Sequence, residues 1–112
     1  MCFSYICSMN ARIEQLQQWL LKDPNDNFTN YALAMELIAI GNDLEAKTML
    51  EKLIETQPNY FASYYHLGQL LERLGNNEQA ISIYKKGMEI TKKLGEQHAF
   101  GELRSVLEEL EF

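Results

Sequence analysis

The sequence has few cysteines and few prolines, and this scarcity excludes several kinds of protein. Both cysteines, Cys2 and Cys7, lie within the first seven residues. They are too near the terminus for a disulfide framework, and their spacing is not a common metal-binding one. We therefore expect reduced thiols and no metal site. Only two prolines occur, Pro24 and Pro58, and no segment is of low complexity.

The sequence also lacks a long apolar run of the kind that enters a membrane. The opening MCFSYICS is apolar, but it has no basic leader. It is too short for the core of a signal peptide and far too short to span a bilayer. The composition, 46% apolar and 23% charged, is that of an ordinary soluble protein of one domain. We expect a cytoplasmic protein that does not bind membranes.

Positive charge is scarce as well. The formal net charge is -6, and nucleic-acid affinity depends largely on Lys and Arg that neutralise phosphates. The densest basic group is Lys85, Lys86, Lys92 and Lys93, with Glu89 between the two pairs. This pattern is typical of a solvated helix flank. We expect no nucleic-acid partner.

The signatures of common enzymes are absent from the sequence. His66 and His98 stand outside any HExxH motif, and there is no glycine-rich phosphate loop and no serine in a nucleophile elbow. We interpret His66 as a partly exposed helix or groove residue. Glu108 and Glu109 are adjacent, so they diverge on a helix. We expect no enzyme activity, no catalytic residue and no cofactor.

The sequence does contain an internal repeat. Shifting residues 24–57 by thirty-four places onto residues 58–91 makes ten positions identical, which is well above chance and typical of stacked helical repeats. The identical pairs are Pro24/Pro58, Asn25/Asn59, Tyr31/Tyr65, Leu33/Leu67, Leu37/Leu71, Gly41/Gly75, Asn42/Asn76, Ala46/Ala80, Lys52/Lys86 and Glu55/Glu89.

Each repeat reads as two helices joined by a short turn. Leucines recur at helical spacing up to Gly75. Glycine adopts the left-handed conformation that ends a helix at a lower energetic cost than other residues do. Asn76 then caps the next helix, with Gln79 as the other half of a capping box. Gly41, Asn42 and Glu45 form the same turn in the first repeat. Ala46 and Ala80 lie where the two helices of a pair cross closely.

Helices are also predicted on both sides of the repeats. Apolar residues at helical spacing predict a helix over 10–22 and a capping helix over 96–111. The repeats cover about 27–58 and 61–92, so residues 10–112 form one domain of six helices after a flexible segment at 1–9. Met9 is an alternative start of the protein. We also hypothesise that the apolar residues of 1–8 compete with a groove ligand.

With these residues in view, the sequence resembles a tetratricopeptide-repeat (TPR) protein over about residues 10–92. The second repeat fits the family pattern best, through Tyr64, Leu67, Gly68, Leu71, Gly75, Ala80 and Tyr84. The first repeat departs from it, with Asn30 at an aromatic position and Ala34 at a glycine position. The resemblance implies an all-α, right-handed superhelix of two repeats with flanking helices, and a concave groove that binds a peptide.

The resemblance also implies which residues face that groove. They are Phe28, Tyr31, Met35 and Ile38 from the first repeat, and Ala62, Tyr65, Gln69, Glu72 and Arg73 from the second. Ten of the thirteen residues from Phe28 to Ile40 are apolar, so this helix must be covered on more than one face. The cover is another part of the chain, an external peptide or helix, or a second copy of the chain.

Some relatives clamp the acidic C-terminus of a chaperone with Lys, Asn and Arg. At the corresponding places this sequence has Tyr31, Met35, His66, Glu96 and Phe100, so we expect no such clamp. The predicted function is a scaffold or adaptor that binds a protein or peptide in the groove. The alternative is a self-associating structural protein, a homodimer without a separate ligand.

Overall fold

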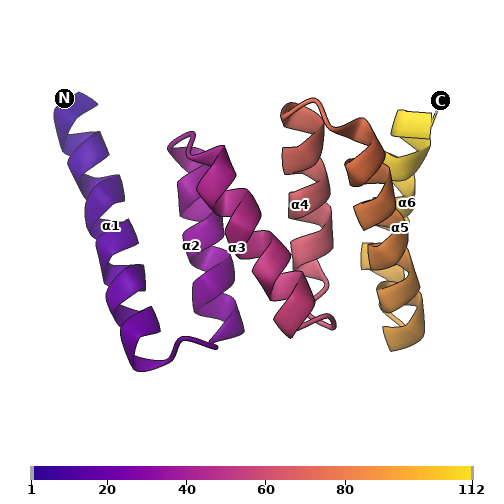
Figure 1. The fold of residues 1–112 in the computed structure, drawn as a ribbon, viewed down its shortest axis with the longest axis horizontal. Coiled ribbons are helices and arrows are strands. Elements are labelled where there is room, and N and C mark those ends of the chain that lie inside the picture. The colour runs from indigo at the N-terminus through magenta and orange to yellow at the C-terminus, as the bar shows by residue number, and fades with distance from the viewer. Residues whose placement is uncertain (1, 112) are drawn as a thin grey trace. The chain divides into compact units, whose positions relative to one another are not determined.

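The computed structural model describes the backbone of residues 2–111 and the side chains of residues 11–111. Over the described backbone it contains six α-helices and no strand, which confirms the predicted all-α class. The helices, labelled in Figure 1, are α1 Cys2–Lys22, α2 Asn27–Ala39, α3 Asp43–Thr56, α4 Ala62–Arg73, α5 Asn77–Leu94 and α6 Gln97–Glu111.

Helix α1 is longer than the helix predicted over 10–22. It begins at Cys2, so the backbone of the segment predicted to be flexible belongs to the same helix. The reason is local, because no glycine or proline interrupts the sequence between residues 2 and 22. The hypothesis that residues 1–8 compete for a groove concerns side chains outside the described residues.

The chain divides into two compact units, Met1–Met49 and Leu50–Phe112, whose boundary falls inside α3. In the first unit α1 packs against α2. The buried apolar residues of these two helices include Ile13 and Leu16 of α1 and Leu33 and Leu37 of α2. These residues recur every three or four positions, as the buried stripe of a helix requires.

The glycine–asparagine turns have the predicted geometry. Gly41 and Gly75 adopt left-handed φ angles of 83° and 81°, which cost little without a Cβ. The next amide then reaches back to the helix that has just ended. Asn42 N donates to Leu37 O and Asn76 N to Leu71 O, each at 2.8 Å. This pattern satisfies carbonyls that the helix end would otherwise leave unpaired.

The asparagines also act on the helix that follows. The Asn76 Oδ1 accepts from the Gln79 backbone amide at 3.4 Å, which confirms it as the cap of α5. In the first repeat, the Asn42 side-chain amide instead donates to the Glu45 carboxylate at 2.7 Å. Both arrangements join the cap position to the residue three places on.

The second unit has a tightly packed core between α4 and α5. Tyr64 and Tyr84 are fully buried, and the ring of Tyr84 lies directly over Gly68. A Cβ on Gly68 would lie 2.5 Å from Tyr84 Cζ, so only glycine fits there. Ala80 is also completely buried, as expected for a small residue at a close helix crossing. Ala46 is equally buried at the matching position of the first repeat.

The two repeats hold their connecting loops in the same way with different side chains. The Tyr64 hydroxyl donates to the Pro58 carbonyl at 2.6 Å. Thirty-four residues earlier, the Asn30 side-chain amide donates to the Pro24 carbonyl at 3.0 Å. Asn30, which departs from the family pattern, thus makes the hydrogen bond that the aromatic residue makes in the second repeat.

Candidate functional site

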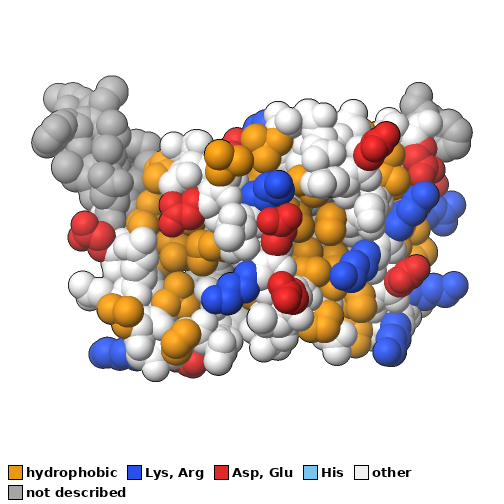
Figure 2. All heavy atoms as spheres, viewed as in Figure 1, with side chains coloured by type: hydrophobic (Ala, Val, Ile, Leu, Met, Phe, Trp, Pro, Cys, Tyr) orange, Lys and Arg blue, Asp and Glu red, His pale blue; other side chains and the backbone are white. Residues whose placement is uncertain are grey.

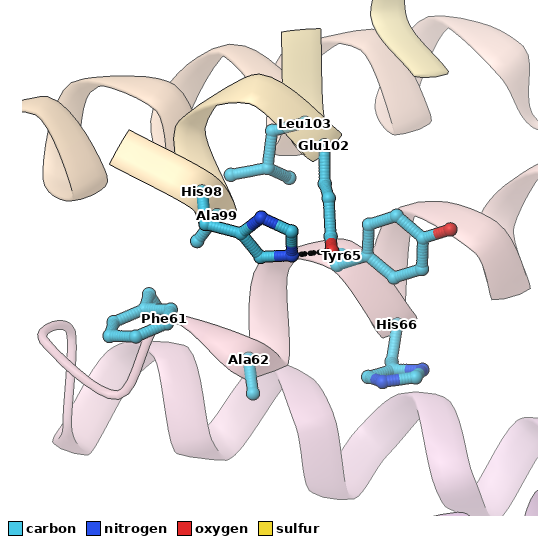
Figure 3. A pocket seen from close by; sticks show the side chains of 8 residues that line it. All are labelled: Phe61, Ala62, Tyr65, His66, His98, Ala99, Glu102 and Leu103. Carbon is cyan, nitrogen blue, oxygen red and sulfur yellow. Dashed lines mark ion pairs between the residues drawn. The ribbon is translucent and has the colours of Figure 1, made fainter. Parts of the chain in front are cut away.

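The second unit contains an open pocket of about 630 Å³ between the first turns of α4 and α6 (Figure 3). One side is lined by residues at the start of α4, namely Phe61, Ala62, Tyr65 and His66. The other is lined by residues of α6, namely His98, Ala99, Glu102 and Leu103. We call Phe61, Ala62, Ala99 and Leu103 the apolar wall.

Helical spacing explains why these side chains share the pocket. On α4 they occur at two adjacent positions and again four residues later, which places them on one face. Leu67, Leu70 and Leu71 of the same helix are instead buried in the core. Leu103, which is 2% exposed, belongs both to the core and to the apolar wall of the pocket. The core therefore fixes the two helices that carry the pocket.

The polar groups of the pocket are one carboxylate and two imidazoles. His98 Nε2 lies 2.7 Å from Glu102 Oε1, and both side chains are largely exposed. Burial lowers the pKa of His66, an effect that the nearby charge of Glu102 partly opposes. The ring of Tyr65 meets the ring of His66 edge to face, with centroids 5.4 Å apart. Among the described residues that line the pocket there is no Lys and no Arg.

The groove residues predicted on α4 have different surroundings. Tyr65 is half-buried and lines the pocket, together with Ala62. Gln69 and Glu72 both hydrogen-bond the Tyr84 hydroxyl, with Gln69 Nε2 donating at 2.9 Å and Tyr84 donating to Glu72. The predicted polar contacts thus hold a core tyrosine in place. Arg73 is exposed near the end of α4.

The groove residues predicted on α2 all belong to the first unit. Phe28 is 69% exposed, so the structure leaves most of this ring uncovered. Tyr31, Met35 and Ile38 are half-buried. The surplus of apolar residues on α2 is therefore only partly covered within the chain. Contact of these four residues with a partner stays a prediction.

The α6 side of the pocket was not predicted from the sequence. The family register assigned Glu96 and Phe100 to groove places, and the structure places Phe100 elsewhere. Its side chain lines a hollow against α5, with Met88 and Lys92. The residue matches between repeats end before α6, although α6 begins thirty-five residues after α4, the same interval as from α2 to α4. The four-residue spacing of Leu103 and Leu107 does predict which face of α6 is buried, since both leucines are buried.

The described residues show no arrangement typical of a metal or membrane protein. Among residues 11–111, no three His, Cys, Asp or Glu side chains gather so that they would hold a metal ion. No helix in the described part of the chain is both long and apolar enough to cross a membrane.

The lysines predicted to lie on a solvated flank are indeed exposed on α5. Lys85 lies 3.3 Å from Glu111, and Lys86, Lys92 and Lys93 are exposed as well. Acidic and basic side chains are interspersed over this helix in Figure 2. The basic residues of α5 therefore do not form a surface of one sign.

Comparison with known proteins identifies the repeats. Family models described as tetratricopeptide repeat match residues 29–60 and 49–82. A tetratricopeptide repeat domain protein from Salinibacter ruber, solved by NMR, is 42% identical, with 80% of this chain and 90% of that one aligned and a TM-score of 0.77. A crystal structure of such a protein from the same organism is 40% identical, covers 78% and 97% of the two chains, and has a TM-score of 0.74.

More distant structures share the fold. PcrH, in complex with the chaperone binding region of PopD, is 13% identical, with 96% of this chain and 81% of that one aligned and a TM-score of 0.83. No protein with a curated description matches the sequence. The repeat fold has a general role in protein interaction and is generally not enzymatic. The chain belongs to the tetratricopeptide repeat family.

Proposed function

We propose that the chain is an adaptor that binds a peptide or helix of another protein, and that the α4–α6 pocket receives a side chain of that ligand. The observation that carries the proposal is the pocket itself. It is open, is carried by two helices fixed in the core, and has an apolar wall beside a few polar groups. That combination is typical of a ligand site.

Two further observations support this function. Two aromatic residues line the pocket, Phe61 just before α4 and Tyr65 within it. Aromatic side chains often supply much of the binding energy at interfaces. PcrH, which shares the fold, was solved with a segment of another protein.

Peptides selected from a random library on the purified chain test the proposal. Their affinities are measured by calorimetry for the wild type and two pocket variants. Tyr65→Ala removes the aromatic side chain, and Ala99→Leu fills the pocket from the α6 side. We expect each variant to weaken binding about tenfold or more, because truncation of an anchor often costs about 2 kcal/mol.

Phe28→Ala is the matched control for Tyr65→Ala. It also removes an aromatic side chain, but from an exposed position on α2 in the first unit. We expect it to leave affinity for pocket-directed peptides unchanged. If Phe28→Ala weakens every selected peptide and neither pocket variant does, the α2 residues are the binding site and the pocket is not.

Self-association is the second candidate function. Three large apolar side chains of the first unit, Trp19, Leu21 and Phe28, are 50%, 84% and 69% exposed. Large apolar groups at the surface are typical of a protein–protein contact when they are contiguous. Light scattering after size-exclusion chromatography measures the mass. A dimer that Trp19→Ser and Leu21→Ser convert to a monomer supports this candidate, and a monomeric wild type at high concentration excludes it.

A further inference from the structure

Helix α6 separates two hollows of different charge. On the α4 side, Glu102 contributes a carboxylate, and the lining as the structure describes it contains no Lys or Arg. On the α5 side, Lys85 and Lys92 line the hollow around Phe100, with Glu89 as the acidic residue. The cations of the second unit therefore lie mainly along α5, away from the α4–α6 pocket.

The nearest cation on α6 is already paired elsewhere. Arg104 Nε lies 3.0 Å from Glu108 Oε1, one turn further along the helix. Glu102 instead has the His98 imidazole beside it at 2.7 Å. Glu102 is the one carboxylate among the described residues that line the pocket, and none of them is a Lys or an Arg. Counted over Lys, Arg, Asp and Glu, the described lining therefore has one negative charge and no positive one.

The shape of the pocket combines this charge with apolar surface. In Figure 3 the Glu102 side chain extends from α6 toward α4, and its carboxylate ends between the His98 and Tyr65 rings in this view. The residues of the apolar wall line the same pocket. An arginine side chain has matching parts, because its methylene stem packs on apolar surface and its guanidinium binds carboxylates and stacks on aromatic rings.

We propose that the pocket selects a peptide by an arginine side chain. In this arrangement the stem lies on the apolar wall, and the guanidinium donates to the Glu102 carboxylate and stacks on the Tyr65 ring. The inference rests on the proposed function, since it specifies the ligand of the same pocket. It excludes acidic peptides, which Glu102 repels.

Three synthetic peptides test the charge requirement. They share the sequence acetyl-Ala-Leu-Xaa-Leu-Ala-amide, where Xaa is arginine, citrulline or glutamate. Citrulline has nearly the shape of arginine without its charge. Binding is measured by titration of the full chain, followed through the backbone amide shifts of Ala62, Ala99 and Glu102. We expect saturable shifts with arginine, affinity about fivefold or more weaker with citrulline, and no saturation with glutamate.

Two variants of α6 assign the effect to one carboxylate. Glu102→Gln removes the charge in the pocket. Glu108→Gln is the matched control, because both carboxylates are about half exposed and both lie four residues after their partners on α6. We expect Glu102→Gln to reduce the preference for arginine over citrulline about fivefold, and Glu108→Gln to preserve it.

A third variant tests the competition for Glu102. The His98 side chain is 92% exposed, so His98→Ala leaves the fold intact. The His98 imidazole lies against one oxygen of the Glu102 carboxylate, so its removal leaves that oxygen open to a guanidinium. We therefore expect His98→Ala to bind the arginine peptide at least as tightly as the wild type does, and a marked loss of affinity in this variant would contradict the competition.

The outcomes separate this inference from the proposed function. Equal affinity for the arginine and citrulline peptides overturns the arginine selectivity, while saturable shifts in the pocket still support peptide binding there. An unchanged preference in Glu102→Gln overturns the role of that carboxylate. If none of the three peptides shifts the pocket amides, the inference is wrong, and the library-selected peptides alone decide whether the pocket binds another sequence.

Discussion

Replacing Gly68 with alanine should destabilise the protein severely, although alanine favours a helix. A Cβ at this position would lie 2.5 Å from Tyr84 Cζ and closer still to Cε1, where ordinary van der Waals contact needs about 3.4–4 Å. The Tyr84 ring would have to move by about 1 Å. Its surroundings resist this, because the ring is fully buried and its hydroxyl is bonded to Gln69 and Glu72.

The magnitude follows from three contributions. Overpacking of a tight core typically costs about 1 to 3 kcal/mol. Displacing the Tyr84 hydroxyl from its two partners costs about 1 kcal/mol for each hydrogen bond. The higher helix propensity of alanine returns about 1 kcal/mol. We therefore expect Gly68→Ala to lower the free energy of unfolding by about 2 to 4 kcal/mol, a large part of the stability of a small domain.

Urea unfolding followed by helical circular dichroism measures this change, and Gly101→Ala is its control. Gly101 lies inside α6 with open space around the position of a Cβ, so the same substitution should stabilise by up to about 1 kcal/mol. Opposite signs for the two variants support the argument. If Gly68→Ala is as stable as the wild type, the close contact with Tyr84 does not exist. Adding Tyr84→Leu to Gly68→Ala should recover part of the loss.

The remaining predictions concern the same core. Ala80→Leu should cost about 1 to 3 kcal/mol in urea unfolding, whereas Ala11→Leu, on an exposed face of α1, should change stability little; equal effects would contradict the close crossing. Burial and the hydrogen bond to Glu72 raise the pKa of Tyr84 above its ordinary value of 10.0. The unfolded chain therefore ionises first, and stability should fall as the pH rises above about 10. Tyr84→Phe should show a shallower alkaline decline in urea midpoints, and parallel declines would refute this role.

Much of the fold was predictable because its signals are local or periodic. The thirty-four-residue period locates the two repeats, and Gly41 and Gly75 mark turns whose left-handed backbone requires glycine. The length of α1 was not predictable with equal precision. Helix starts without a strong cap leave only weak signals in a sequence, and the opening apolar residues fit a tail as well as a helix.

The candidate site was only partly predictable for a geometric reason. Tyr65 was assigned to the groove by register, and it lines the pocket. Its neighbours across the pocket, His98 and Glu102, belong to α6, where the residue matches between repeats have ended. The sequence predicts Glu72 as a groove contact. It does not show that the hydroxyl of Tyr84, twelve residues later, donates to the Glu72 carboxylate.

The hydrogen bonds from Asn30 and Tyr64 to the preceding prolines bear on how such repeats are found in sequences. Each side chain reaches a carbonyl six residues earlier, and the two differ in size and aromaticity. The shared requirement is a donor of sufficient reach. A search pattern that accepts only aromatic residues at this position scores Asn30 as a mismatch, although Asn30 makes the same hydrogen bond to the proline carbonyl. A pattern that pairs any such donor with the carbonyl six residues before it would detect degenerate repeats that residue identity alone misses.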